Sequence, residues 1–432
     1  MAKLLLRGMV LPMSGAEDFY PQGEVAVDGD RIVSVGAKGS APRGFEPDRL
    51  LDRSNDVIMP GLINTHTHAA MTLLRGYADD LPLMPWLEDK VWPFEAKLSD
   101  EDIYWGTMLA LTEMIRSGTT TMSDMYASMD RVAEAVLSAG TRAALARGMI
   151  GSAANGLQAL RENIELYRAC HRAGEGRLRV MFGPHAPYTC PGDFLQRVKS
   201  EAESLGAGIH IHVAETEAEI ETIRQEHGRT PVQWLNDLGL FDGPVLAAHC
   251  VHLTPADMEI LAEKQVCVAH NPESNMKLNS GTAPVPELTR RGVVVSLGTD
   301  GASSNNNLDL FGEMRSAALQ QKLRVDSSAL PAYEVLEMAT VKGARALGFE
   351  EVGMLAPGFK ADLITVDFDQ PHFYPRFSIP AHLVYAAHAG DVRDVMVNGR
   401  MIMEERRLLS LDEKKICAEA EKRAKGIARE LL

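Results

Sequence analysis

The nine residues PGLINTHTH, Pro60 to His68, decide the fold of this chain. They complete a short apolar run, Val57–Asn64, and end in two histidines separated by one residue. Side chains at positions i and i+2 of a strand project from the same face, so His66 and His68 point the same way. Neutral imidazoles at this spacing can bind one divalent metal. An H-x-H pair alone is a weak signal, so its weight depends on what surrounds it.

Seven further apolar runs follow along the chain, each succeeded by a helical pattern. Strand-helix alternation of this kind indicates parallel β/α units. Eight such units predict an α/β fold of the (β/α)8 TIM-barrel type, whose chemistry lies at the C-terminal ends of the strands. Besides Val57–Asn64, the runs are Thr119–Met125, Arg142–Met149, Arg179–Pro184, Gly208–Ala214, Pro244–His249, Val266–His270 and Val293–Thr299.

Both ends of the chain have a β-rich pattern. Residues 24–35 form two alternating runs around an Asp-Gly turn, which is a hairpin signal. Strand patterns return at Ala361–Asp367 and Val392–Val397, and residues 411–430 have the periodicity of a surface helix. We therefore expect a small β-sandwich domain with a C-terminal helix, built from residues 1–57 and 357–432, beside a barrel of residues 58–356.

Charge and composition exclude several classes of protein. The chain has 432 residues, 45% of them hydrophobic, with 44 Lys and Arg against 59 Asp and Glu, a net charge of −15. Such a charge repels phosphate backbones, so no nucleic-acid partner is expected. No apolar run approaches the ~18 residues of a membrane helix, so no membrane partner is expected either. Scattered cysteines without a C-x-x-C pair indicate reduced thiols and a cytoplasmic location (Cys170, Cys190, Cys250, Cys267 and Cys417).

Reactive residues end several of the other predicted strands. His212 lies near the end of the fifth run, with Glu215 three residues further on, and His249 ends the sixth. Asp300 follows the eighth. His210 shares a face with His212 but lies deeper, where a packed interior histidine is expected. Any one of these residues could be accidental, but all of them together are hard to explain as packing.

These motifs resemble the amidohydrolase superfamily. The resemblance rests on Pro60–His68, His212-Val213-Ala214-Glu215, Gly298-Thr299-Asp300 and the returning strand at Pro357–Leu363, and it covers nearly the whole chain. It implies one catalytic divalent metal, zinc first and Fe²⁺ or Mn²⁺ as alternatives. The ligands that it implies are His66, His68, His212 and Asp300.

The third and fourth runs end without the lysine that bridges two metals in binuclear members. Together with the strand-six histidine, this looks like the mononuclear deaminase branch. A metal in such a site lowers the pKa of its water from ~15.7 towards ~7. The resemblance implies that Asp300 takes the proton of that water and that His249 orients it. Glu215 would hydrogen-bond the ring nitrogen and move a proton to the leaving ammonia.

The segment from Leu81 to Glu95 follows the first barrel strand and is expected to form a lid. It resembles the equivalent loop of 5′-methylthioadenosine/S-adenosylhomocysteine deaminases. The resemblance implies that Glu95 accepts hydrogen bonds from both ribose hydroxyls and that Trp86 walls the pocket. It also implies substrate-binding roles near the ribose and the 5′ substituent for Arg147 and His185. Arg161 lies in a helical pattern that does not match the family, so its role stays open.

The expected reaction is hydrolytic deamination at adenine C6 of 5′-substituted adenosines, by a metal-activated hydroxide. The family resemblance also implies a homo-oligomer. The preferred 5′ substituent and the acceptance of adenosine itself stay open at this point. The alternative hypotheses are a guanine or cytosine deaminase, or a triazine chlorohydrolase of the same superfamily. A relative without catalysis, serving in assembly, should bind no stoichiometric metal.

Overall fold

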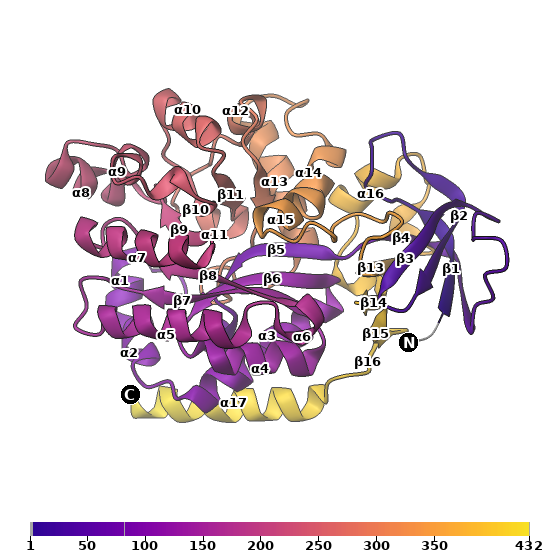
Figure 1. The fold of residues 1–432 in the computed structure, drawn as a ribbon, viewed down its shortest axis with the longest axis horizontal. Helices are drawn as coiled ribbons and strands as arrows, with labels where there is room; N and C mark the ends of the chain where they lie inside the picture. Colours follow the sequence, from indigo (N-terminus) through magenta and orange to yellow (C-terminus); the bar gives the residue numbers. More distant parts are fainter. Residues whose placement is uncertain (1–2, 82, 432) are drawn as a thin grey trace.

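The computed structural model describes residues 3–81 and 83–431. Eight parallel strands form one sheet in the order β5 to β12, which confirms the predicted barrel (Figure 1). The sheet curls until β12 lies against β5, where the Asp300 amide donates a 2.9 Å hydrogen bond to the His66 carbonyl. The strands are β5 (Leu62–Thr67), β6 (Thr119–Tyr126), β7 (Arg142–Met149), β8 (Leu178–Pro184), β9 (Ile209–Val213), β10 (Val245–His249), β11 (Cys267–His270) and β12 (Val295–Leu297).

Helices connect the strands and cover the outside of the barrel (Figure 1). Several begin at a residue whose side chain caps the N-terminus of the helix. For example, Ser99, Thr230 and Thr254 each cap a helix and form a capping box with the residue three positions later. The helices are α3 (Asp100–Arg116), α4 (Met129–Ala139), α5 (Gly156–Cys170), α6 (Ala173–Gly176), α7 (Gly192–Leu205), α8 (Glu217–His227), α9 (Pro231–Asp237), α10 (Pro255–Glu263), α11 (Pro272–Lys277), α12 (Val285–Arg290), α13 (Leu310–Arg324), α14 (Ala332–Met338) and α15 (Val341–Ala346).

Both chain ends build a second, separate sheet. Its order is β16-β15-β14-β13-β4-β1-β2-β3, so strands from the C-terminal part pair with β4 of the N-terminal part. The predicted hairpin is present as β2 and β3, and Gly29 takes the turn with φ +68°. The strands are β1 (Lys3–Val10), β2 (Tyr20–Asp28), β3 (Arg31–Ala37), β4 (Arg49–Pro60), β13 (Leu363–Asp367), β14 (Val392–Val397), β15 (Arg400–Glu404) and β16 (Arg407–Leu408), with α16 (Ile379–Tyr385) between β13 and β14.

The first predicted barrel run, Val57–Asn64, is divided between the two sheets. Val57 to Pro60 belong to β4 and pair with β13, whereas the barrel strand β5 starts at Leu62. Gly61 marks the change, and a Cβ there would lie 2.2 Å from the Thr120 side chain. Only glycine allows this close approach, so the Pro-Gly pair switches the chain from one sheet to the other.

The C-terminal helix α17 (Glu413–Glu430) confirms the helix expected over 411–430. It runs along the outside of α3 (Figure 1, yellow). Its buried Ala420 and Ile427 join a cluster with Trp86, Val91 and Phe94 of the segment after β5. That segment contains α1 (Leu83–Trp86), a π-helical turn at Leu87–Val91 and α2 (Trp92–Glu95); Pro82 of the expected lid lies outside the described residues. No helix in the described parts of the chain is long and apolar enough to span a membrane.

Candidate metal and active site

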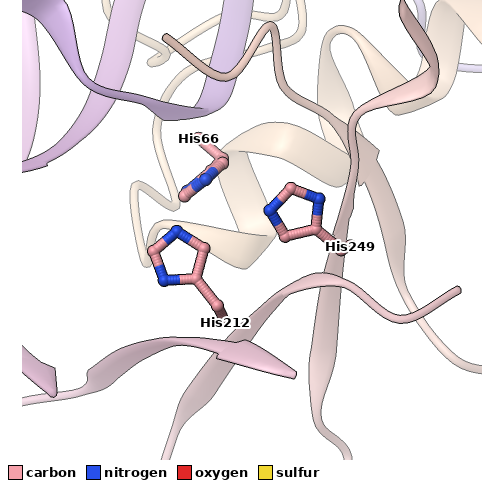
Figure 2. Close-up of side chains that lie close together, drawn as sticks. All are labelled: His66, His212 and His249. Atoms are coloured by element: carbon pink, nitrogen blue, oxygen red, sulfur yellow. The ribbon is translucent and has the colours of Figure 1, made fainter. Parts of the chain in front are cut away.

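Three histidines meet at the C-terminal ends of the barrel strands. His66 lies near the end of β5, His212 in β9 and His249 at the end of β10 (Figure 2). Their imidazole rings face one another across the mouth of the barrel, with ring centres 4.8 Å apart for His66 and His212 and 5.4 Å apart for His66 and His249. Parallel strands bring these sequence-distant residues together because their carboxyl ends share one edge.

The four predicted metal ligands lie together in the same place. Nε2 of His66 and Nε2 of His68 lie 3.5 Å and 3.3 Å from Oδ1 of Asp300. Nε2 of His212 lies 3.4 Å from Nε2 of His68. Donors bonded at ~2.0–2.2 Å to a tetrahedral zinc ion lie at roughly such separations from one another. His249 also comes within 4.8 Å of His66 and His212, ligand atom to ligand atom, so it faces the same point.

In each of the three histidines predicted as ligands, the other ring nitrogen, Nδ1, already has a hydrogen-bond partner. Nδ1 of His68 donates to the Met125 carbonyl at 2.6 Å, and Nδ1 of His212 donates to the His185 carbonyl at 2.7 Å. Nδ1 of His66 lies 2.8 Å from Nε2 of the buried His210. Such hydrogen bonds fix the ring and leave Nε2 free to bind a metal. Nε2 of His66 is buried and has no hydrogen-bond partner among the described residues, so this nitrogen is available as a metal ligand.

The protonation states suit metal binding as well. Burial lowers the pKa of His66 to about 4 and holds the pKa of His212 well below its usual value, so both rings are neutral. Burial acts to raise the pKa of Asp300, but the close approach of His66 and the other surrounding imidazoles hold that pKa well below the usual range. Ser274 and Ser304 also donate to Oδ2 of Asp300, at 2.7 and 3.0 Å. Neutral imidazoles and an ionised carboxylate form a donor set that fits a divalent metal.

Glu215 and His249 lie beside this cluster. Nε2 of His249 is 3.8 Å from Oε2 of Glu215, whose side chain is only 14% exposed. Nδ1 of His249 donates to Oδ1 of Asn275 at 2.9 Å. Burial raises the pKa of Glu215; it acts to lower the pKa of His249, but the Glu215 and Asp300 carboxylates outweigh it and raise that pKa. The raised pKa of Glu215 makes its protonated form more accessible than that of an exposed glutamate, and the raised pKa of His249 favours its charged form.

The backbone at these strand ends is strained. Ala214, His249, Cys250 and Asp300 have φ values of +53°, +72°, +50° and +60°, in the left-handed region that non-glycine residues rarely adopt. Conformations of this kind persist only where the surrounding structure holds them, and they gather at functional sites. Contacts with the surrounding structure therefore hold the turns after β9, β10 and β12 in this backbone conformation.

A cavity of about 280 Å³ opens above the cluster. All five residues predicted to bind substrate line it, and so do all the predicted metal-site and catalytic residues except the fully buried His66. Apolar side chains of the lid segment and of the strand ends complete the wall. The predicted residues are Trp86, Glu95, Arg147, His185 and Glu215, and those of the metal site are His68, His212, His249 and Asp300.

Glu95 has a partner that the sequence did not indicate. The Tyr126 hydroxyl, at the end of β6, donates to Oε1 of Glu95 at 2.5 Å. Burial raises the pKa of Glu95, and the hydrogen bond from Tyr126 acts against this rise. Tyr126 ends a barrel strand, and this position was the only signal that could have pointed to it. Oε2 of Glu95 has no hydrogen-bond partner among the described residues, so the carboxylate retains free acceptor capacity.

The remaining predicted residues occupy distinct positions. Nε of Arg147 donates to Glu162 at 2.9 Å, so its charge is partly compensated. His185 bonds Thr189 through Nδ1 at 2.9 Å, and burial lowers its pKa to about 4. Arg161 lies on the exposed side of α5, where it donates to Gln158, and it does not line the cavity.

Comparison with known proteins gives a consistent result. The model of the Amidohydrolase family matches residues 57–402. A 5-methylthioadenosine/S-adenosylhomocysteine deaminase of Desulfitobacterium hafniense (strain Y51) is 71% identical over 431 residues, all of both chains. A 5′-deoxyadenosine deaminase of Methanosarcina mazei is 50% identical over 99% of both.

A solved structure is similar over nearly its full length. The adenosine deaminase from Xanthomonas campestris with bound zinc superposes with a TM-score of 0.95 at 36% identity, covering 99% of this chain and 98% of that one. The fold, the ligand set and the sequence likeness agree. The chain belongs to the amidohydrolase family, in the branch of the 5-methylthioadenosine/S-adenosylhomocysteine deaminases.

Proposed function

We propose that this protein hydrolytically deaminates 5′-substituted adenosines to the corresponding inosine analogues and ammonia. The substrates that we propose are 5′-methylthioadenosine and S-adenosylhomocysteine, with 5′-deoxyadenosine and adenosine as further candidates. The names of the similar proteins from Desulfitobacterium and Methanosarcina support this substrate class.

The position of Glu95 is the observation that carries the proposal. Its carboxylate lines the same cavity as the metal-ligand cluster. A carboxylate offers two acceptor oxygens and no donor, which suits the two hydroxyls of a ribose cis-diol. A free base or a triazine has no diol and would leave Oε2 of Glu95, the oxygen that Tyr126 does not bind, without a donor from the substrate. The site therefore favours a nucleoside over the substrates of a guanine or cytosine deaminase or a triazine chlorohydrolase.

The metal site supplies the nucleophile in this proposal. His66, His68, His212 and Asp300 would hold a divalent metal, which would lower the pKa of a bound water and so supply an activated nucleophile at neutral pH. Asp300 accepts a proton from the attacking water, and its ionised state suits that role. His249, fixed through Nδ1 by Asn275, directs Nε2 at the same point and orients the water.

Glu215 acts on the purine ring. Because burial raises its pKa, it can hold a proton that it donates to the ring nitrogen next to C6. Addition of the water oxygen to C6 is then matched by protonation of that nitrogen. Glu215, now ionised, takes the proton of the new C6 hydroxyl and passes it to the amino group. The C–N bond then breaks as the C6 carbonyl forms, ammonia leaves with the bonding electron pair, and the proton held by Asp300 returns to Glu215 before the next turnover.

The lid and the strand ends select the nucleoside. Trp86 packs in the lid cluster and presents its indole to the cavity. Apolar side chains such as Val91 and Met125 offer a surface for a thioether, and sulfur packs well against such groups. Arg147 and His185 lie on the wall that we assign to the ribose and the 5′ substituent.

Zinc is the metal that we propose, since the similar Xanthomonas structure holds it and the ligands are three imidazoles and one carboxylate. We further propose a cytoplasmic homo-oligomer, from the family resemblance. Metal analysis and light scattering of the purified protein test these two points.

A substrate panel tests the function. Ammonia release by the zinc-loaded protein is measured with methylthioadenosine, S-adenosylhomocysteine, 5′-deoxyadenosine, adenosine, guanine and cytosine. We expect activity confined to the adenosines. Activity on guanine or cytosine alone would contradict the proposal and would identify a free-base deaminase.

A further inference from the structure

Glu219, in the first turn of α8, is a buried carboxylate that the proposed chemistry does not use. Glu219 is only 3% exposed. Oε1 accepts a 2.8 Å hydrogen bond from the Ala214 amide, and Oε2 accepts a 2.9 Å bond from the Glu215 amide. One carboxylate therefore holds two consecutive peptide groups, the second of which is that of Glu215 itself.

The Ala214–Glu215 peptide connects two parts of the site. Its amide, that of Glu215, donates to Glu219, while its carbonyl, that of Ala214, accepts hydrogen bonds from the amides of Val251 and His252, both at 3.0 Å. These two residues follow His249 in the turn after β10. Glu219 thus stabilises a peptide to which the loop of His249 is also attached, and it does so where Ala214 has the strained φ of +53°.

Burial of the Glu219 carboxylate is unfavourable for folding. No lysine or arginine of the described residues forms an ion pair with it, and burial raises its pKa to about 7 although both amides lower it. An unpaired buried carboxylate costs folding free energy. A neutral acceptor could hold this turn with a smaller loss of folding free energy. The use of a carboxylate therefore indicates that the geometry of this turn matters for activity.

We infer that Glu219 is a positioning residue for the reaction: its two hydrogen bonds set the place of the Glu215 carboxyl relative to His249 and the metal ligands. This inference rests on the proposed function. Glu219 does not line the cavity and acts through Glu215. Without this carboxylate, the amides of Ala214 and Glu215 lose their acceptor, and the turn that contains Glu215 is free to move.

The substitution Glu219→Gln tests the inference, because the amide keeps the size but can accept from only one of the two peptide groups. We expect kcat for methylthioadenosine to fall about 10- to 100-fold, the scale of a small displacement of a reacting group. KM should change little, since the residues lining the ribose side are untouched. Metal content should stay at the wild-type value. Glu217→Gln, an exposed glutamate two residues earlier on the same helix, is the matched control and should behave as wild type.

A double-mutant cycle with Glu215→Gln distinguishes positioning from general destabilisation. If Glu219 acts through Glu215, adding Glu219→Gln to Glu215→Gln should cost little further turnover. Where Glu219→Gln does not fold, the same cycle is run with Glu219→Asp, which keeps both acceptor oxygens on a shorter side chain and should give a smaller loss of kcat.

Three results would overturn the inference: unchanged kcat in the Glu219 variant, loss of the metal, or a loss of turnover that multiplies fully with that of Glu215→Gln. These comparisons are made relative to the wild-type rate. A wild-type protein that releases no ammonia from any adenosine instead contradicts the proposed function, so the two failures are separate observations.

Discussion

Asp300 is the residue to which we assign two tasks, those of metal ligand and base. Its Oδ1 faces His66 and His68, while its Oδ2 accepts hydrogen bonds from Ser274 and Ser304. These donors favour the charged form, which is the form that binds a metal and accepts a proton. The backbone of this residue lies in the left-handed region, with φ +60°. The surrounding hydroxyls and imidazoles thus determine the chemistry of this aspartate.

Replacing Asp300 with asparagine tests its role as a base. The substitution preserves shape and removes the charge, so we expect a folded protein whose turnover falls by ~10² or more, the scale of a lost general base. Steady-state ammonia release and metal content are measured together, with the exposed Asp326→Asn as control. Near-normal turnover in Asp300→Asn would contradict the assigned role.

Glu95→Gln tests ribose recognition. A hydrogen bond to a charged group contributes about 1.5–3 kcal/mol, so kcat/KM for methylthioadenosine should fall roughly 10- to 150-fold. Activity on 2′,3′-dideoxyadenosine, which lacks the diol, should stay at its wild-type value. Glu88→Gln, on the exposed side of the lid segment, is the matched control. Equal losses on both substrates would show that Glu95 does not read the diol.

At the scale of elements, the site depends on where each strand ends. The turns after β9, β10 and β12 each contain a residue with positive φ, and hydrogen bonds between the loops hold them. The start of β5 is equally constrained, because Gly61 lies against Thr120 of β6 and allows the chain to leave β4. His66 and His68 take their positions from the register that begins there.

Gly61→Ala should therefore destabilise the protein. Its Cβ would lie 2.2 Å from Thr120, and overpacking of this kind costs typically about 1–3 kcal/mol. The free energy of unfolding in urea measures the effect. Gly243→Ala is the control, since a Cβ there meets nothing within 4 Å and its φ of −116° is open to any residue. Equal stability of the two variants would be inconsistent with this account of the switch between sheets.

For the whole molecule, the sequence predicted the barrel, the second sheet and the C-terminal helix, because strand-helix periodicity and turn residues are local signals. The family was predicted correctly from its motifs. The division of the first run between β4 and β5 was missed, because a continuous apolar run does not show which sheet pairs with it. Residues that act through contacts distant in sequence, such as Tyr126 on Glu95, depend on the packed structure and leave no pattern in one chain.

Removal of the metal should affect the whole protein. A ligand that binds only the folded state adds to its stability, so chelation should lower the midpoint of thermal unfolding as well as activity, and zinc should restore both. His66→Ala should behave like the chelated wild type and lose the metal, as elemental analysis would show, whereas the exposed His227→Ala should retain it. Retention of a full equivalent by His66→Ala would contradict the ligand assignment.

Hydrolytic deamination at C6 is the central claim, and isotope transfer tests it most directly. The zinc-loaded protein is incubated with methylthioadenosine in H₂¹⁸O, and the product is identified by mass spectrometry alongside an ammonia assay. We predict methylthioinosine with a single ¹⁸O on the purine and one ammonia per product molecule. Release of adenine, which would indicate cleavage of the glycosidic bond, or recovery of unchanged substrate would contradict the account.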